Sequence, residues 1–157
     1  MPEKNRVVIT GMGTITPLGL GVEEHWQGLV AGKSAIGPIT RFDTEKYPVK
    51  VGAEVKGFDP ENYMDIKRVD RTSLCTQFAI AAAGMALKNA KLDIEKEQPG
   101  RAGTVIATSG SMDMLIDEAE VLNRRGPMRI NPLLISKISP SMAVSYTHLT
   151  LPTKRIV

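Results

Sequence analysis

Residues 6–19 read RVVITGMGTITPLG, and this stretch decides the fold of the chain. It begins with residues 7–9, a run of β-branched side chains that is typical of a short buried strand. Gly11 and Gly13 then allow backbone angles that side chains forbid, so a turn follows the strand. Residues 22–31 continue with the periodicity of an amphipathic helix. A strand, a glycine turn and a helix in this order predict the opening of an α/β layered domain.

The composition is that of a soluble globular domain. The chain has 157 residues, of which 42% are apolar and 24% charged, as is usual for one domain. Its net charge is only +3, and the basic residues are scattered among acidic ones, which argues against a nucleic-acid partner. No apolar run is long enough to span a membrane, and residues 1–5 lack the features of a signal peptide. The single cysteine fits a reducing compartment, so we expect a cytoplasmic protein without a membrane partner.

The glycine turn invites interpretation as a dinucleotide fingerprint, which it fails on two counts. Gly11 and Gly13 are followed by Thr16 where the third glycine should stand, and Pro17 comes next. No acidic residue closes a second strand about 20 residues later, where the ribose contact would require it. We therefore predict no nucleotide cofactor.

Beyond this opening, the patterns of strand and helix alternate. Residues 49–55 alternate apolar and polar side chains, which predicts a half-exposed strand. Asp59 followed by Pro60 is a helix-start signal. A long helix is predicted over residues 72–90. Its centre, residues 78–87, is apolar on every face, so protein must cover it on both sides.

The last third of the chain predicts one more strand and one more helix. Residues 102–107, AGTVIA, have the composition of a second core strand. Residues 113–123 have the spacing of a helix, and Gly126 with Pro127 forms a turn after it. The inward face of this helix would consist of Met114, Leu115, Ala119 and Leu122.

Two residues deserve consideration as catalytic groups, and neither is predicted to be one. His25 has no nearby nucleophile and no metal-ligand spacing, so we expect a solvated surface histidine. Cys75 lies in the apolar helix without a Ser, Lys or His beside it to lower its pKa. We expect a buried, inert thiol, because free cysteines often serve as small hydrophobes. No catalytic residue and no metal site follow from these patterns.

Residues 7–13, VVITGMG, followed by TPLG at residues 16–19, closely resemble the opening of the type II β-ketoacyl-[acyl carrier protein] synthases. The resemblance runs from about Arg6 to about Ala143. It implies a thiolase-like fold, of which residues 1–143 would be the incomplete N-terminal half of an α-β-α-β-α layering. Residues 144–157 resemble a translated sequencing adapter and are expected to be an artefact. Within the resemblance, the basic and acidic residues from Arg68 to Arg71 are expected to form structural ion pairs.

The resemblance implies an acyltransferase of fatty-acid synthesis that joins an acyl chain to malonyl-[acyl carrier protein] with loss of CO2. Family members use a cysteine thiolate at a helix N-terminus and two histidines. In the family pattern these three residues lie beyond the end of this chain. No catalytic residue can therefore be mapped, and the chain alone is expected to be inactive. The implied partners are acyl carrier protein, acyl and malonyl thioesters, and a second copy in a homodimer.

The family also has a glycine-rich turn that lines the acyl pocket. Here the turn, residues 108–113, reads TSGSMD and contains one glycine. Candidate residues for the acyl pocket or the subunit interface are Gly110, Met112, Leu133, Leu134 and Ile135. Because this turn has fewer glycines than the family pattern, an alternative interpretation is a non-catalytic, chain-length-factor-like partner of a polyketide or fatty-acid synthase. An unrelated α/β binding module is a third reading, for which the sequence offers no ligand site.

Overall fold

The computed structural model of the chain describes residues 6–98, 100–109, 111–139 and 141–144. The described residues divide into two compact units. One unit contains the residues up to Phe58 together with Gly84–Leu92, and the other contains Asp59–Ala83 and the residues from Asp93 onward.

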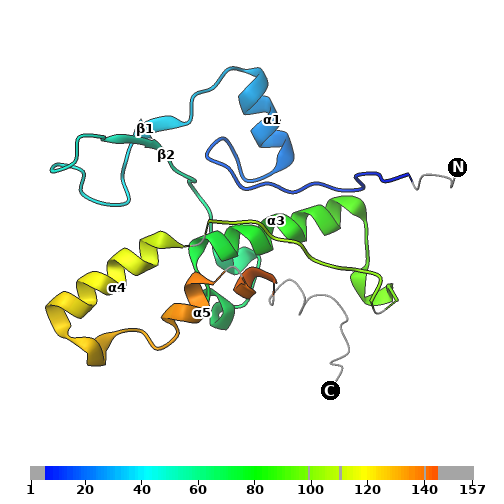
Figure 1. The fold of residues 1–157 in the computed structure, drawn as a ribbon. Coiled ribbons are helices and arrows are strands. Elements are labelled where there is room, and N and C mark those ends of the chain that lie inside the picture. The colour runs from blue at the N-terminus through cyan, green and yellow to red at the C-terminus, as the bar shows by residue number, and fades with distance from the viewer. Residues whose placement is uncertain (1–5, 99, 110, 140, 145–157) are drawn as a thin grey trace, which may run out of the picture. The chain divides into compact units, whose positions relative to one another are not determined.

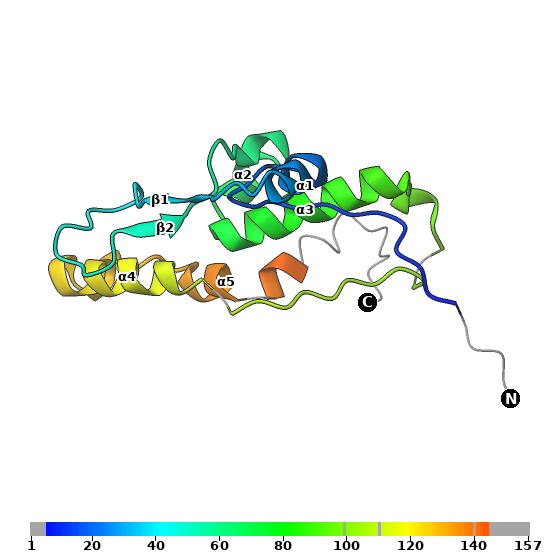
Figure 2. The same cartoon turned by 90° about the horizontal axis from the view of Figure 1, so that it is seen from above.

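The first unit contains helix α1, Val22–Val30, and a hairpin of β1, Ile36–Pro38, and β2, Val51–Ala53. The two strands are antiparallel, with Gly37 opposite Gly52, and lie side by side in both views (Figures 1 and 2). The predicted helix over 22–31 is confirmed. The predicted strand over 49–55 is confirmed over its three central residues, of which Gly52 is half-buried and its neighbours are exposed.

The predicted buried strand at residues 7–9 is wrong in this structure. The segment is extended but belongs to no strand, and Val7 and Ile9 are 93% and 84% exposed. The reason is that a strand is stable only when a neighbour satisfies its backbone groups, and the described part of the chain provides no neighbour.

A glycine contact fixes the same stretch instead. A Cβ at Gly11 would lie 2.3 Å from the carbonyl oxygen of Ala86 and 2.6 Å from the nitrogen of Ala90, both in helix α3, Leu74–Ala90. The next residue, Met12, donates its N–H to Oδ1 of Asn89 over 3.0 Å. The opening stretch therefore packs on the last turns of α3 at a distance that only glycine permits.

The second unit is helical. Its elements, besides the first part of α3, are η1 Pro60–Asn62, α2 Ile66–Val69, η2 Ile94–Lys96, α4 Met112–Arg125, η3 Pro127–Arg129 and α5 Leu134–Ile138. Residues 141–144 are also helical. The predicted long helix, the Asp59–Pro60 helix start and the helix over 113–123 are confirmed. The buried side chains include Ile80 and Ala81 of α3, beside the polar Thr76 and Gln77.

Two predictions for the second unit are wrong. Residues 102–107 are extended but form no strand, and Val105 is 97% exposed, for the same lack of a pairing neighbour. The inward face of α4 is also different from the prediction. Of the predicted inward residues, only Met114 is half-buried, together with Glu118 and Val121. The others, Leu115, Ala119 and Leu122, are exposed. The reason is that α4 packs against η3 and α5 only over part of its surface.

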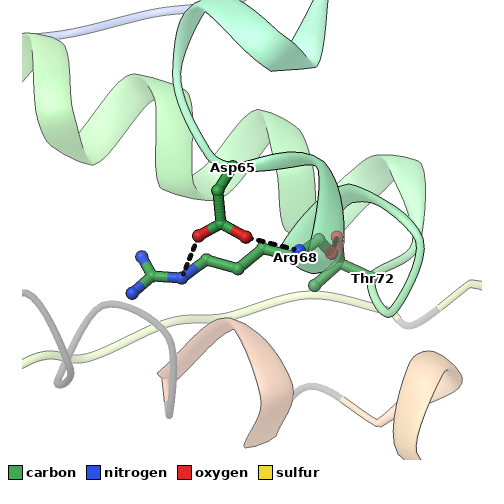
Figure 3. Close-up of polar contacts among 3 residues, drawn as sticks. All are labelled: Asp65, Arg68 and Thr72. Atoms are coloured by element: carbon green, nitrogen blue, oxygen red, sulfur yellow. Dashed lines mark hydrogen bonds and ion pairs between the residues drawn. The ribbon is translucent and has the colours of Figure 1, made fainter.

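The corner between α2 and α3 is held by polar side chains (Figure 3). Asp65 caps α2 by accepting the N–H of Arg68 over 3.1 Å, and its other oxygen lies 3.1 Å from Nε of Arg68. Thr72 donates its hydroxyl to the carbonyl of Arg68 over 2.7 Å. Gln77, which is buried, donates Nε2 to the carbonyls of Val69 and Thr72. Arg68 thus has the predicted structural ion-pair role, with Asp65 as its partner. The prediction is wrong for Asp70 and Arg71, which are exposed and form no ion pair among the described residues.

We expect Asp65→Ala to lower the stability of the α2 turn by about 1 kcal/mol, the usual effect of losing a helix cap. Asp65→Asn is the matched control, because it keeps an oxygen for the cap and loses only an exposed ion pair, which contributes about 0.2–1 kcal/mol. Amide exchange at Arg68 in the 157-residue chain measures the effect of each substitution on the α2 turn. Equal exchange rates in the alanine variant and the unmodified chain would contradict the cap.

We also expect the 157-residue chain to lack a sharp, cooperative thermal transition. Val7, Ile9 and Val105 are almost fully exposed, and each large apolar side chain left in water forgoes about 1.5–3 kcal/mol of burial. The stability of a whole domain is only about 5–15 kcal/mol. Circular dichroism and amide exchange would measure this. A monomer with a sharp transition and a protected Val105 amide would be the opposite result.

Candidate functional site

The predicted pocket and interface residues lie around α4 and α5, except Gly110, which lies outside the described residues. Met112 begins α4 and is 64% exposed. Leu133 precedes α5 and is 43% exposed, whereas Ile135 within α5 is 72% exposed. Leu134, the first residue of α5, is half-buried. The two exposed side chains flanking Leu134 are available for contact with another surface.

Glu118 links α4 to the segment before α5. Its Oε2 accepts the N–H of Asn131 over 3.0 Å, and Oδ1 of Asn131 accepts the N–H of Leu133 over 2.9 Å. These two successive hydrogen bonds hold the segment before α5 against the middle of α4. Neither Glu118 nor Asn131 was predicted from the sequence, although an Asn before a Pro is a recognisable turn signal.

A shallow hollow of about 320 Å³ lies along α4. Its walls are Asp117, Glu120, Val121, Arg124 and Arg125. Glu120 and Arg124 form an exposed ion pair across one turn, with an N–O distance of 2.5 Å. The predicted acyl-pocket residues do not line this hollow, so it does not correspond to the predicted pocket.

Cys75 lies in a cluster of hydroxyl groups. Its Sγ is 3.0 Å from Oγ of Ser111 and 3.4 Å from Oγ of Ser73, and Ser73 donates to Oγ1 of Thr76 over 3.1 Å. The expectations that Cys75 is buried and has no Ser beside it are therefore wrong. Cys75 is half-buried, and folding brings Ser111 to it from 36 positions along the chain. No motif or spacing in the sequence indicates this long-range contact.

The contacts around Cys75 suit a structural thiol better than a nucleophile. Ser111 and Ser73 are only 4% and 2% exposed, so the thiol partners buried hydroxyls rather than leaving them unsatisfied. A hydroxyl does not take a proton from a thiol at neutral pH, and a nucleophilic cysteine needs a base or a cation for that purpose. The contacts therefore explain why Ser111, the residue before α4, makes no side-chain cap bond to that helix.

His25 is not the solvated residue that the sequence predicts. Its ring is half-buried, and Nδ1 lies 2.9 Å from Oγ1 of Thr16. The same hydroxyl oxygen accepts the N–H of Leu18 over 3.2 Å, and Thr16 pairs with Gly19 through two backbone bonds. His25 thus supports the turn after the opening stretch.

Neither a candidate metal cluster nor a candidate membrane-spanning helix occurs in the part of the chain that the structure describes. In that part, no group of three or more His, Cys, Asp and Glu side chains is arranged to hold a metal ion. None of the helices described there has the length and apolar character that crossing a bilayer requires.

Comparison with known proteins identifies relatives along nearly the whole chain. The family model for the beta-ketoacyl synthase N-terminal domain matches residues 4–151, so the match ends beyond the boundary expected at residue 143. A 3-oxoacyl-[acyl-carrier-protein] synthase 2 from Synechocystis is 39% identical over 97% of this chain and 37% of its own length. The synthase of the same name from Staphylococcus aureus is 37% identical over 98% and 37%, respectively. This chain therefore spans little more than a third of these curated relatives.

Solved structures agree on the fold. A structure titled as the ishigamide ketosynthase/chain length factor has a TM-score of 0.74 and 32% identity, and covers 92% of this chain and 37% of its own. A beta-ketoacyl synthase from Burkholderia phymatum has a TM-score of 0.77 at 23% identity, and covers 96% and 38%. The expected fold class is confirmed: the described residues form an incomplete part of a thiolase-like α/β fold. Because the family model accounts for residues 4–151 of 157, the chain belongs to the beta-ketoacyl synthase family.

Proposed function

We propose that the complete protein is a condensing enzyme that joins an acyl chain to malonyl-[acyl carrier protein] with loss of CO2. The observation that carries the proposal is the identity of 37–39% with synthases of that activity over nearly the whole chain. In this reaction a thiolate attacks the acyl thioester and expels the carrier thiol. Loss of CO2 from the malonyl group leaves an enolate, which attacks the acyl-enzyme and releases the thiolate.

The 157-residue chain by itself is proposed to be inactive. Its cysteine, Cys75, belongs to the second unit and contacts hydroxyl groups. The half-buried His25 and its partner Thr16 both belong to the first unit. The described residues therefore offer no thiol with a histidine as its hydrogen-bond partner. What the chain would contribute to the complete enzyme is scaffold, with Met112 and residues 133–135 beside the acyl pocket or the subunit interface.

The proposed partners are an acyl carrier protein and a second copy of the synthase, in the cytoplasm. A structural neighbour of this chain is a type II polyketide ketosynthase in complex with its acyl-carrier protein, which supports a carrier as the partner. The exposed Leu133 and Ile135 support an apolar contact between subunits near α5.

A second candidate is a non-catalytic, chain-length-factor-like subunit. It is favoured by the neighbour whose title joins a ketosynthase with a chain length factor, at 32% identity, and by the single glycine in residues 108–113. The complete gene distinguishes the two candidates. A cysteine in an Ala-Cys-Thr-like turn supports the condensing enzyme, and its replacement supports the non-catalytic subunit.

We expect the purified 157-residue chain to form no 3-oxoacyl product from acyl- and malonyl-carrier substrates. The physical reason is that no thiol among its described residues is paired with a base. Mass spectrometry of the carrier-bound products measures this, with the Synechocystis synthase as the active control. Product above a blank without protein would refute the proposal of inactivity.

The complete protein is expected to be a dimer that Ile135→Glu weakens at least about tenfold, because a charge would enter an apolar contact. Ser136→Glu is the matched control, since Ser136 is the exposed neighbour, and it should leave the dimer nearly unchanged. Light scattering over a range of concentrations measures both variants. A monomeric parent protein, or an Ile135→Glu dimer as tight as the parent, would exclude this interface.

A further inference from the structure

Glu54, the residue directly after β2, binds the bend that follows β1. Its Oε1 accepts the N–H of Thr40 over 3.1 Å and that of Arg41 over 3.2 Å. Its Oε2 accepts the hydroxyl of Thr40 over 2.7 Å and lies 3.2 Å from the same Thr40 nitrogen. Successive backbone N–H groups that point at one anion form a nest. This nest is filled by a carboxylate from the same chain.

We propose that Glu54 is an internal carboxylate ligand that clamps the Thr40–Arg41 bend to β2, and that protonation of Glu54 releases the bend. Hydrogen bonds to an ionised acceptor are roughly twice as strong as neutral ones, so a neutral carboxyl holds the nest weakly. The bend is the first part of the loop over residues 40–50, so release of the clamp frees this end of the loop.

The charges around Glu54 support the direction of this switch. The Thr40 hydroxyl is the largest cause that lowers the pKa of Glu54. Partial desolvation opposes it, and the two N–H groups and the positive charge of Arg41 lower the pKa further. Since the pKa is lower in the clamped state, the clamp is fully present above the ordinary carboxyl pKa and is lost as the pH falls through the lowered value.

Another contact in the loop involves a carboxylate, because Oδ1 of Asp43 accepts the N–H of Glu45 over 2.9 Å. The remaining backbone and ring contacts of the hairpin do not titrate between about pH 2.5 and pH 7. The strands β1 and β2 contain no ionisable side chain, and Lys50 and Lys56 flank β2 in the sequence. The loop is also held by the Ile39 N–H bond to the Lys50 carbonyl, 3.0 Å long. An edge-to-face contact joins Phe42 and Tyr47, with ring centroids 5.6 Å apart. The clamp is local, so it can be observed in a chain that does not unfold cooperatively.

Nuclear magnetic resonance of the 157-residue chain tests the clamp between about pH 2.5 and pH 7, the range in which carboxyl groups titrate. We expect the Thr40 and Arg41 amide signals to follow the Glu54 carboxyl with one midpoint, below the ordinary pKa of a glutamate side chain. The protection factor of the Thr40 amide should fall about tenfold on acidification, because an opened hydrogen bond no longer slows exchange.

Glu54→Gln keeps the side-chain shape and should abolish the titration of the Thr40 and Arg41 signals. Glu45→Gln is the matched control and should leave that titration unchanged. The proposal is overturned if the Thr40 amide is unprotected in the parent chain at neutral pH. It is equally overturned if the two amides titrate independently of Glu54, or if their titration persists in Glu54→Gln.

Discussion

The apolar helix α3 is the constraint on which the rest of the structure depends. A helix that is apolar on all faces must be covered on all faces, and α3 contributes residues to both compact units. Its first turns bury Thr76, Gln77 and Ile80 within the second unit. Its last turns receive the glycine-rich opening stretch, through Gly11, in the first unit. Each unit is therefore organised around one part of the same helix.

The helices could be predicted from the sequence because their determinants are local. Periodicity placed α1 and α4, and a long run that is apolar on every face placed α3. The Asp59–Pro60 pair correctly marked the start of η1. The strands at residues 7–9 and 102–107 failed, since a β-branched run specifies an extended backbone but not the neighbour that pairs with it. The side of α4 that is covered also depends on what packs against it, so periodicity alone misassigned it.

The site was less predictable than the fold. Family resemblance identified the synthase relationship, which the comparisons confirm. It drew attention to residues 133–135, whose role stays a prediction. The Cys75–Ser111 contact joins residues far apart in the sequence, and no spacing rule reports such a pair. The His25–Thr16 contact could have been suspected, because His25 lies in the first turn of α1, only nine positions after Thr16. Polar partners of this kind depend on tertiary packing, whereas motifs depend on local sequence.

Gly11 has a consequence at the level of the gene. Every missense change in a glycine codon introduces a Cβ, and at this position a Cβ would lie 2.3 Å from a backbone oxygen of α3. Backbone atoms of a helix cannot move aside as a flexible side chain can. Gly37 and Gly103, by contrast, have no atom within 4 Å of such a Cβ. Nucleotide changes that replace glycine are therefore sterically tolerated at Gly37 and Gly103. At Gly11, any nucleotide change that alters the amino acid produces a steric clash with α3.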